Sequence, residues 1–171
     1  MHLRVIDNLA GVNDYLAERE NDLFFSDTKI QRFDWGKAGL GVSSIRVLVV
    51  EDFLPFRQFI RSTVEKTNGL QVICEVSDGL EAVQKAEELK PDLILLDVGL
   101  PTLNGIEAAR QIRELSPESK VLFVSQESSA DIVREALSTG AQGYVFKTRA
   151  GSDLLPAIEA VILGKRFVST A

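Results

Sequence analysis

This sequence of 171 residues has one cysteine, and it lacks both long apolar runs and clusters of basic residues. With Cys74 alone no intramolecular disulfide can form, and this scarcity favours a cytoplasmic setting. Cys74 lies in the apolar run LQVICEV, where a small core residue is expected rather than a reactive thiol. No apolar run approaches the ~18 residues of a membrane-spanning helix, so no membrane is expected as a partner.

The charge balance argues against nucleic acid as a partner. The formal net charge is −6, and the lysines and arginines form no cluster that could contact phosphates. An acidic chain of this kind is suited instead to a metal cation or to a basic protein surface. The first residues also lack a basic stretch followed by an apolar one, so no secretory signal is expected.

From Ile45 onward, short β-branched runs alternate with segments of helical periodicity. The runs predict five strands, at residues 45–50, 70–76, 92–97, 120–125 and 143–147. Gly69, Gly140 and Gly164 follow helical segments, where a left-handed C-cap is expected. This alternation predicts an α/β fold of the flavodoxin-like, doubly wound (βα)5 type, with a five-stranded parallel sheet in the order 2-1-3-4-5.

Residues 1–44 do not follow this alternation and are predicted to form an N-terminal extension to the domain of residues 45–171. Two interpretations of the extension remain open, a flexible tail and a short amphipathic helix that serves in docking or dimerisation. Ile6, Leu9 and Leu16 lie roughly on one face of such a helix. The extension is too short to build a core of its own, which favours the tail.

Acidic residues end the first and third predicted strands, the two most uniformly apolar of the five. Glu51 and Asp52 follow the first strand, and Asp97 ends the third. Because neighbouring strands lie about 4.8 Å apart, the three carboxylates are expected to converge at the carboxyl edge of the sheet. Like charges this close repel one another unless a cation is present, and oxygen ligands select Mg²⁺ where phosphate chemistry takes place. Helix capping would explain one such acid, but not two apolar strands that both end in acid.

Two further strand ends complete the predicted site. Ser125 ends the fourth strand and Lys147 the fifth, which places a hydroxyl and an ammonium group on the same edge as the acids. Either residue alone is ordinary at a strand end, but the whole set suits phosphoryl transfer onto a carboxylate, with Asp97 as the nucleophile. Mg²⁺ would bridge Asp97, Asp52 and one phosphoryl oxygen. Lys147 and Ser125 would hold the other two oxygens.

The motifs VVED, DLILLDVGLPTLNG, VLFVS and GAQGYVFK together resemble the receiver domain of two-component response regulators. The resemblance covers residues 45–169, and the tail GSDLLPAIEAVILGKRFVS is similar to the NarL/FixJ-like subfamily. In that subfamily a helix-turn-helix DNA-binding domain usually follows, whereas this chain ends at Ala171. The resemblance therefore implies a phospho-accepting switch without an attached output domain, and not an enzyme.

The resemblance also implies a role for each matching residue. The phosphoacceptor would be Asp97, assisted by Ser125 and Lys147. The implied Mg²⁺ ligands are the carboxylates of Glu51, Asp52 and Asp97 and the backbone carbonyl of Gly99. The implied switch residues, which move the face of the fourth helix, fifth strand and fifth helix, are Ser125 and Tyr144. The loop after the phosphoacceptor matches at Pro101 and Gly105.

The implied partners are a sensor histidine kinase or a histidine phosphotransfer protein, and a downstream protein that the sequence does not identify. A phosphorylation-dependent homodimer is a further expectation. Two residues depart from the usual pattern: Gln126 replaces a small residue and could crowd Asp97, and Glu127 occupies a position that tunes phosphoryl lifetime. The alternative is a receiver-like interaction scaffold that works without phosphorylation. A phosphatase of the same fold is less favoured because no additional catalytic base is evident.

Overall fold

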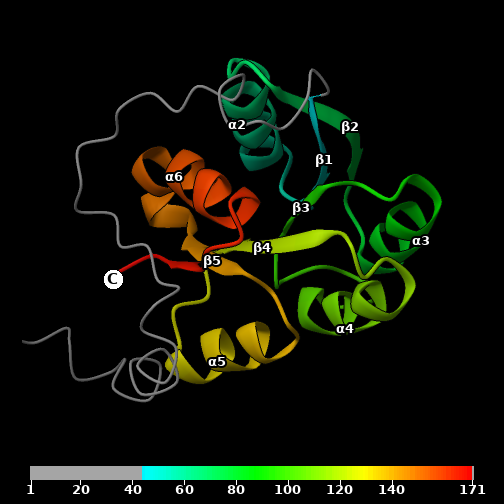
Figure 1. Ribbon diagram of the computed structural model, residues 1–171. Coiled ribbons are helices and arrows are strands. Elements are labelled where there is room, and N and C mark those ends of the chain that lie inside the picture. Colours follow the sequence, from blue (N-terminus) through cyan, green and yellow to red (C-terminus); the bar gives the residue numbers. More distant parts are fainter. Residues whose placement is uncertain (1–43, 171) are drawn as a thin grey trace, which may run out of the picture.

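The computed structural model describes residues 44–170, in which strands and helices alternate along the chain (Figure 1). The strands are β1 (Ile45–Val50), β2 (Leu70–Val76), β3 (Leu93–Leu96), β4 (Lys120–Ser125), β5 (Gly143–Phe146) and β6 (Phe167–Val168). The helices are α2 (Leu54–Glu65), α3 (Gly79–Leu89), α4 (Gly105–Leu115), α5 (Ala130–Ser138), the 3₁₀ turn η3 (Lys147–Arg149) and α6 (Ala150–Ile162). The two interpretations of the N-terminal extension lie outside the described residues.

All strand pairs are parallel, and the sheet has the order β2-β1-β3-β4-β5-β6. The predicted order of the first five strands is confirmed, but the predicted number of strands is wrong, because β6 adds a sixth beside β5. In this pair Phe167 lies opposite Gly143 and Val168 opposite Tyr144. A strand of two residues is too short to show the alternation from which strands are predicted. It forms because Phe167 is buried and because the flanking amide of Ser169 donates to the Tyr144 carbonyl at 2.8 Å.

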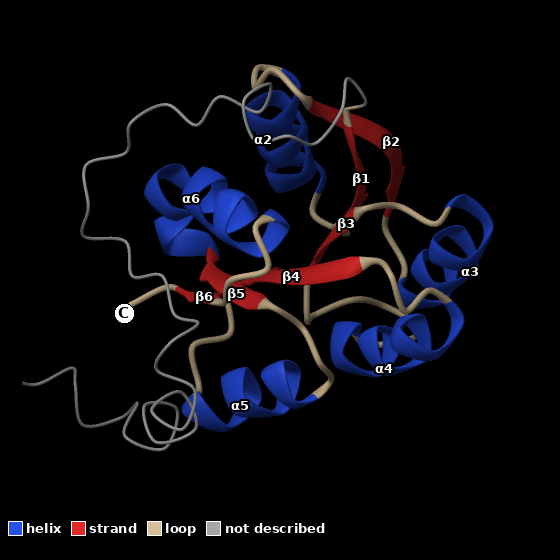
Figure 2. Cartoon of the chain, in the orientation of Figure 1, coloured by secondary structure: helices blue, strands red, loops and turns tan. Residues whose placement is uncertain are grey.

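Helices cover both faces of the sheet, with α2 and α6 on one side and α3, α4 and α5 on the other (Figure 2). Successive residues of each central strand point to opposite faces, so Val47 and Val49 pack under α2 and α6, whereas Leu48 and Val50 pack under the other three helices. Both sets are buried, which explains why the strand sequences are continuously apolar. Cys74 is half-buried against the second set, and burial raises the pKa of its thiol, as expected of a structural residue.

Local signals fix several helix ends. Asp78 accepts hydrogen bonds from the first amides of α3, and Asn104 does the same for α4. Gly69, Gly140 and Gly164 have φ angles of 86°, 96° and 78°, which confirms the predicted left-handed conformation. Among the helices of residues 44–170, none combines the length and the apolar character that crossing a membrane requires.

Candidate metal centre

The three acids of the predicted site meet at the carboxyl ends of β1 and β3. Val50 lies opposite Leu96 in the sheet, so the next residue on each strand, Glu51 and Asp97, lies on the same edge. One carboxylate oxygen from each of Glu51, Asp52 and Asp97 lies within 4.8 Å of the others. Glu51 and Asp97 are buried, whereas Asp52 is exposed at the rim. The strand register therefore produces the convergence that the sequence predicts.

Lys147 brings a positive charge into this cluster from the end of β5. Its Nζ atom lies 2.7 Å from Oδ2 of Asp97 and 2.7 Å from Oε2 of Glu51. Burial alone would lower the pKa of Lys147, but the interactions with the carboxylates of Asp97 and Glu51 together outweigh burial and raise it. Lys147 is therefore an ammonium ion across the physiological pH range, and one cation is shared by two buried carboxylates.

Glu51 shows how the cluster fits a metal ion. Its Oε1 atom accepts a hydrogen bond from the Phe53 amide at 3.0 Å, whereas the buried Oε2 atom has the ion-pair contact with Lys147 but no hydrogen bond of standard geometry. Burial, with a smaller contribution from Asp97, raises the pKa of Glu51 even though Lys147 opposes the shift. A second cation would stabilise these carboxylates, and three hard oxygen donors suit Mg²⁺. The residues present therefore fit the ion that the sequence predicts.

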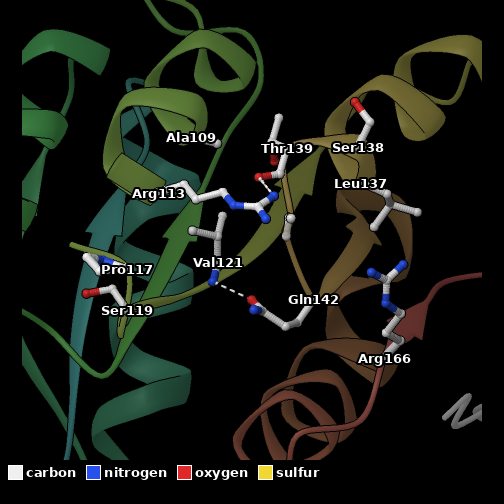
Figure 3. Close-up of a pocket in the computed structure, with 12 residues that line it drawn as sticks. Ala109, Arg113, Pro117, Ser119, Val121, Leu137, Ser138, Thr139, Gln142 and Arg166 are labelled. Atoms are coloured by element: carbon white, nitrogen blue, oxygen red, sulfur yellow. Dashed lines mark hydrogen bonds between the residues drawn. The ribbon is translucent and has the colours of Figure 1, made fainter. Parts of the chain in front are cut away.

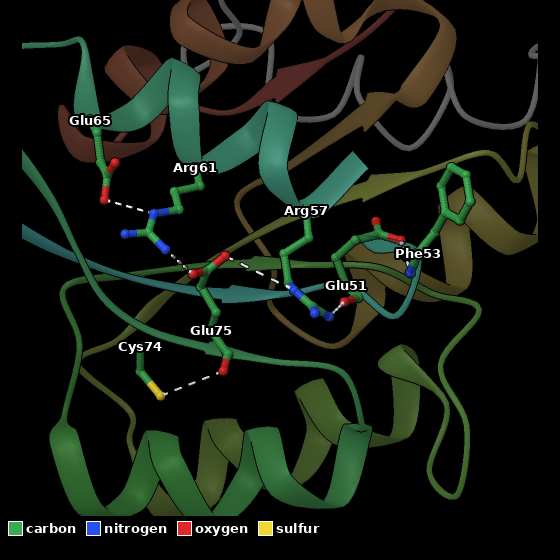
Figure 4. Close-up of polar contacts among 7 residues, drawn as sticks. All are labelled: Glu51, Phe53, Arg57, Arg61, Glu65, Cys74 and Glu75. Carbon is green, nitrogen blue, oxygen red and sulfur yellow. Dashed lines mark hydrogen bonds and ion pairs between the residues drawn. The ribbon is translucent and has the colours of Figure 1, made fainter. Parts of the chain in front are cut away.

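The backbone that carries the acid pair is held by Arg57 on α2, a residue that the sequence analysis did not select. Arg57 Nη1 donates to the carbonyl of Glu51 at 2.6 Å, and its Nε lies 4.0 Å from Glu75 on β2 (Figure 4). Glu75 also accepts from Arg61, which in turn pairs with Glu65. This network joins α2, β2 and the end of β1. The spacing of arginines in one sequence gives no signal of such a contact.

The loop after Asp97 depends on close backbone contacts. The Gly99 amide lies 3.3 Å from Oδ1 of Asp97, and the Gly105 amide donates to the Val98 carbonyl at 2.8 Å. A Cβ atom on Gly105 would lie 1.8 Å from the Asp97 carbonyl oxygen, so only glycine fits there. Pro101 is exposed in the same loop. Metal coordination by the Gly99 carbonyl stays a prediction.

A second glycine, at position 79, was missed by the sequence analysis. A Cβ atom on Gly79 would lie 1.8 Å from the Leu103 carbonyl oxygen, so the start of α3 packs directly on the loop after Asp97. The neighbouring Asp78 caps α3, and a hydrogen bond with Thr102 of the same loop lowers its pKa. Thr102 has a φ angle of 59°, which is rare for a residue other than glycine. These contacts fix the loop that carries Gly99 and Pro101.

The predicted switch residues are both buried behind the acid cluster. Ser125 Oγ accepts from the Glu127 amide at 3.3 Å, and the Tyr144 hydroxyl donates to the Glu127 carbonyl at 2.9 Å. The Tyr144 ring stacks on Phe123 and meets Phe146 edge to face. Burial raises the pKa of Tyr144 well above its usual range. The Tyr144 side chain is therefore inside the protein. Gln126 is exposed.

A cavity of about 420 Å³ lies at the other end of the sheet, beside the amino ends of β4 and β5 (Figure 3). Arg113 and Arg166 both line it, and no carboxylate does. Arg113 Nη1 donates to the Thr139 carbonyl at 2.9 Å, and Gln142 accepts from the Val121 amide at 2.9 Å. None of the predicted site residues lines this cavity, which is therefore separate from the acid cluster.

Comparisons with known proteins agree with this geometry. The sequence profile of the response regulator receiver domain matches residues 47–159. The response regulator GacA of Pseudomonas viridiflava is 37% identical over 125 residues, which are 73% of this chain and 58% of GacA. The chemotaxis protein CheY of Listeria monocytogenes is 34% identical over 115 residues, which are 67% of this chain and 96% of CheY. This chain thus spans little more than half of GacA but nearly all of CheY.

Solved structures show the same likeness. A two-component response regulator of the LuxR family from Aurantimonas superposes with a TM-score of 0.70 at 33% identity, over 73% of this chain and 89% of that one. The response regulator domain of Thermotoga maritima CheB superposes with a TM-score of 0.65 at 36% identity, over 70% of this chain and 97% of that one. With an acidic cluster at the carboxyl edge of a doubly wound sheet, this chain belongs to the response regulator receiver domain family of two-component systems.

Proposed function

We propose that this protein is a phospho-accepting receiver, in which Asp97 is phosphorylated in a Mg²⁺-dependent reaction by a sensor histidine kinase or a histidine phosphotransfer protein. The observation that carries the proposal is the position of the Lys147 ammonium, 2.7 Å from two carboxylates, those of Asp97 and Glu51, of the acid cluster that Asp52 completes. A buried carboxylate that is paired with a lysine and lies next to two further carboxylates is suited to attack on phosphorus. The proposed setting is the cytoplasm.

The metal would be held by the carboxylates of Glu51, Asp52 and Asp97 and by the Gly99 carbonyl. When bound, Mg²⁺ supplies the positive charge that lets a carboxylate approach a phosphoryl group. An oxygen of Asp97 forms the new bond to phosphorus while the bond between phosphorus and the donor's histidine nitrogen breaks. Lys147 neutralises charge on a second phosphoryl oxygen, and the Ser125 hydroxyl donates to a third.

The proposed output of phosphorylation is a change on the face of α5, β5 and α6. Ser125 would turn toward the phosphoryl group and release the Glu127 amide that it now accepts from. The Tyr144 hydroxyl donates to the Glu127 carbonyl, so a movement of this loop would also change the surroundings of the buried ring. The switch is then a shift in population between two packings of the loop after β4.

A second candidate function is the interaction scaffold that needs no phosphorylation, since the exposed Gln126 follows Ser125 at the carboxyl end of β4 and could crowd Asp97. In that case the face of α5, β5 and α6 would bind its partner equally well before and after treatment with a phosphodonor. The intact set of Asp52, Asp97, Ser125 and Lys147 favours the receiver over the scaffold.

Intact-mass spectrometry tests the proposal directly. With Mg²⁺ and a small phosphodonor, the protein should gain the mass of one phosphoryl group, and Asp97→Asn should gain none. Asp131→Asn is the matched control, because Asp131 is exposed on α5 and contacts only Arg134 among the described residues. Absence of a mass gain in the unmodified protein, or an equal gain in Asp97→Asn, contradicts phosphorylation at Asp97.

A further inference from the structure

The Lys147 ammonium lies over the face of an aromatic ring. Its Nζ atom is 4.9 Å from the ring centroid of Phe56, which belongs to the first turn of α2. Phe56 is half-buried and packs against the core between α2, α6 and the sheet. Nothing in the spacing of these two residues indicates the contact, since 91 positions separate Phe56 from Lys147.

A benzene ring attracts a cation because its face carries a partial negative charge, and the attraction is stronger where water is excluded. Nζ is bound on two sides by the carboxylates of Glu51 and Asp97, and the Phe56 ring covers a third side. Only 16% of the Lys147 side chain is exposed, so the ring replaces water there. A third carboxylate at this place would repel the negatively charged phosphoryl group as it approaches. The uncharged ring causes no such repulsion.

The orientation of the Phe56 ring is fixed by its own neighbours. The Phe59 ring lies 5.4 Å from it, centroid to centroid, with an interplanar angle of 35°. The Phe56 amide donates to the Phe53 carbonyl at 3.1 Å, which ties the first turn of α2 to the residue that follows the acid pair. The same turn therefore connects the ring to the backbone of Glu51 and Asp52.

We propose that Phe56 is a positioning residue for phosphoryl transfer, and that its ring holds the Lys147 ammonium at the place where the second phosphoryl oxygen arrives. This inference rests on the proposed function, because it assigns Phe56 to the same reaction at Asp97. The side chain touches neither the phosphoryl group nor the metal. It acts by limiting the positions that Lys147 Nζ occupies before and after transfer.

A fluorination series separates attraction to the ring from simple packing. Mono-, di- and trifluorinated phenylalanine at position 56 keep nearly the shape of the ring while they weaken its attraction for a cation. The affinity of the protein for beryllofluoride in the presence of Mg²⁺, measured by calorimetry, should fall at each step and reach a loss of about threefold to tenfold. The same residues at position 167 are the matched control, because Phe167 is a buried ring of β6 outside the acid cluster and its fluorination should leave the affinity unchanged.

A second measurement needs no phosphoryl analogue. The Cε protons of Lys147 should resonate upfield of an ordinary lysine because of the ring current of Phe56. Phe56→Leu should abolish the upfield shift, and Phe56→Tyr should restore it. An ordinary lysine shift in the unmodified protein overturns the contact itself.

The two measurements distinguish two kinds of failure. If the unmodified protein fails to bind beryllofluoride, the proposed function is wrong and the role of Phe56 fails with it. If the protein binds normally, but the position 56 series shows a constant affinity or the position 167 series an equal loss, only the positioning role is overturned. Thermal unfolding of each variant confirms that the protein is folded.

Discussion

At the scale of single residues, the acid cluster depends on two glycines, which have no side chain, as much as on its carboxylates. Gly105 begins α4 and lies against the backbone of Asp97, where a Cβ atom would approach the carbonyl oxygen to 1.8 Å. Gly79 makes the same kind of approach to Leu103. Contacts this close cannot be relieved by rotating a side chain, because both partners are backbone. The two glycines therefore let α4 approach Asp97 and α3 approach the loop that follows it.

Gly105→Ala should lower the free energy of unfolding by about 2 kcal/mol, because the added methyl group forces the backbone of the loop to move. Gly151→Ala is the control, because no heavy atom outside its own helix turn lies within 4 Å of a Cβ atom at this position in α6. The free energy of unfolding of this variant should stay equal or rise by up to about 1 kcal/mol. Urea denaturation measures both values. Equal stability of the two variants would show that the loop accommodates a side chain at position 105.

The second residue-scale prediction concerns Glu51 and pH. Burial raises its pKa above the ordinary value of 4.5, so the metal-free folded state binds the proton more tightly than the unfolded state. The stability from this protonation is complete below pH 4.5 and is lost as pH rises through the raised folded-state pKa. At pH 7 without Mg²⁺, Glu51→Gln should therefore unfold a few degrees above the unmodified protein.

Differential scanning calorimetry with and without Mg²⁺ checks this prediction. Mg²⁺ should raise the unfolding temperature of the unmodified protein and raise that of Glu51→Gln much less. Glu118→Gln, at an exposed position, should behave like the unmodified protein under both conditions. A lower unfolding temperature for Glu51→Gln at pH 7 without Mg²⁺ would mean that the ion pair with Lys147 outweighs the cost of burial.

At the scale of elements, β6 is attached to the sheet by a buried polar contact. Asp153 in the first turn of α6 is buried, and its Oδ2 atom accepts from Ser169 Oγ at 2.7 Å. The Ser169 hydroxyl oxygen in turn accepts from the Phe146 amide at 3.3 Å. Phe146 is the residue before Lys147, so the chain after β6 is linked to the end of β5 that carries the site lysine.

Ser169→Ala removes both hydrogen bonds and leaves the buried carboxylate of Asp153 with fewer donors. The free energy of unfolding should fall by about 1–3 kcal/mol. Hydrogen exchange of the Ser169 amide, which donates to Tyr144, should become faster than that of amides in β1. Ser138→Ala removes an exposed hydroxyl that donates to the Glu135 carbonyl and should change stability by less than about 0.5 kcal/mol. An equal effect of both variants contradicts the role of the buried contact.

The sequence predicts the first five strands within about one residue at each end, because strands buried on both faces are continuously apolar. It predicts the convergence of Glu51, Asp52 and Asp97 because the ends of parallel strands share one edge. It does not predict β6, because two residues are too few to show the alternation of apolar and polar side chains. Nor does it predict the contacts of Phe56 or Arg57 with the site, since both depend on which helix face meets which strand end. Those contacts arise from tertiary packing and leave no local pattern in the sequence.

At the scale of the whole molecule, the site and the proposed output surface share strand β5. Lys147 follows this strand, Tyr144 lies within it, and β6 pairs with its other edge. A phosphoryl group adds nearly two negative charges beside Lys147. Since α5 and α6 flank β5, a change in the loop after β4 reaches the surface that these helices form. The proposed phosphorylation-dependent homodimer would use this surface.

The exposed side of α5 suits a symmetric dimer because it carries both signs of charge. Asp131 and Arg134 are paired within the helix at 3.0 Å, and Glu135 pairs with Arg110 of α4 at 2.9 Å. In a two-fold interface the same patch meets itself, so a patch with both signs of charge can place an acid of one copy opposite a base of the other. Ion pairs within one chain can therefore be replaced by ion pairs between two chains with little change in free energy.

Light scattering coupled to size exclusion tests the dimer. Mg²⁺ with beryllofluoride should double the molar mass of the unmodified protein and leave Asp97→Asn monomeric. Arg134→Glu should stay monomeric under the same conditions, because its charge would then face Asp131 of the second copy, and it should still bind beryllofluoride. Lys66→Glu, at an exposed position at the end of α2 on the other face of the sheet, is the control for a change of charge and should dimerise normally. If the unmodified protein stays monomeric when it is saturated with beryllofluoride, the dimer is contradicted. The output of this receiver would then consist of contacts with other proteins.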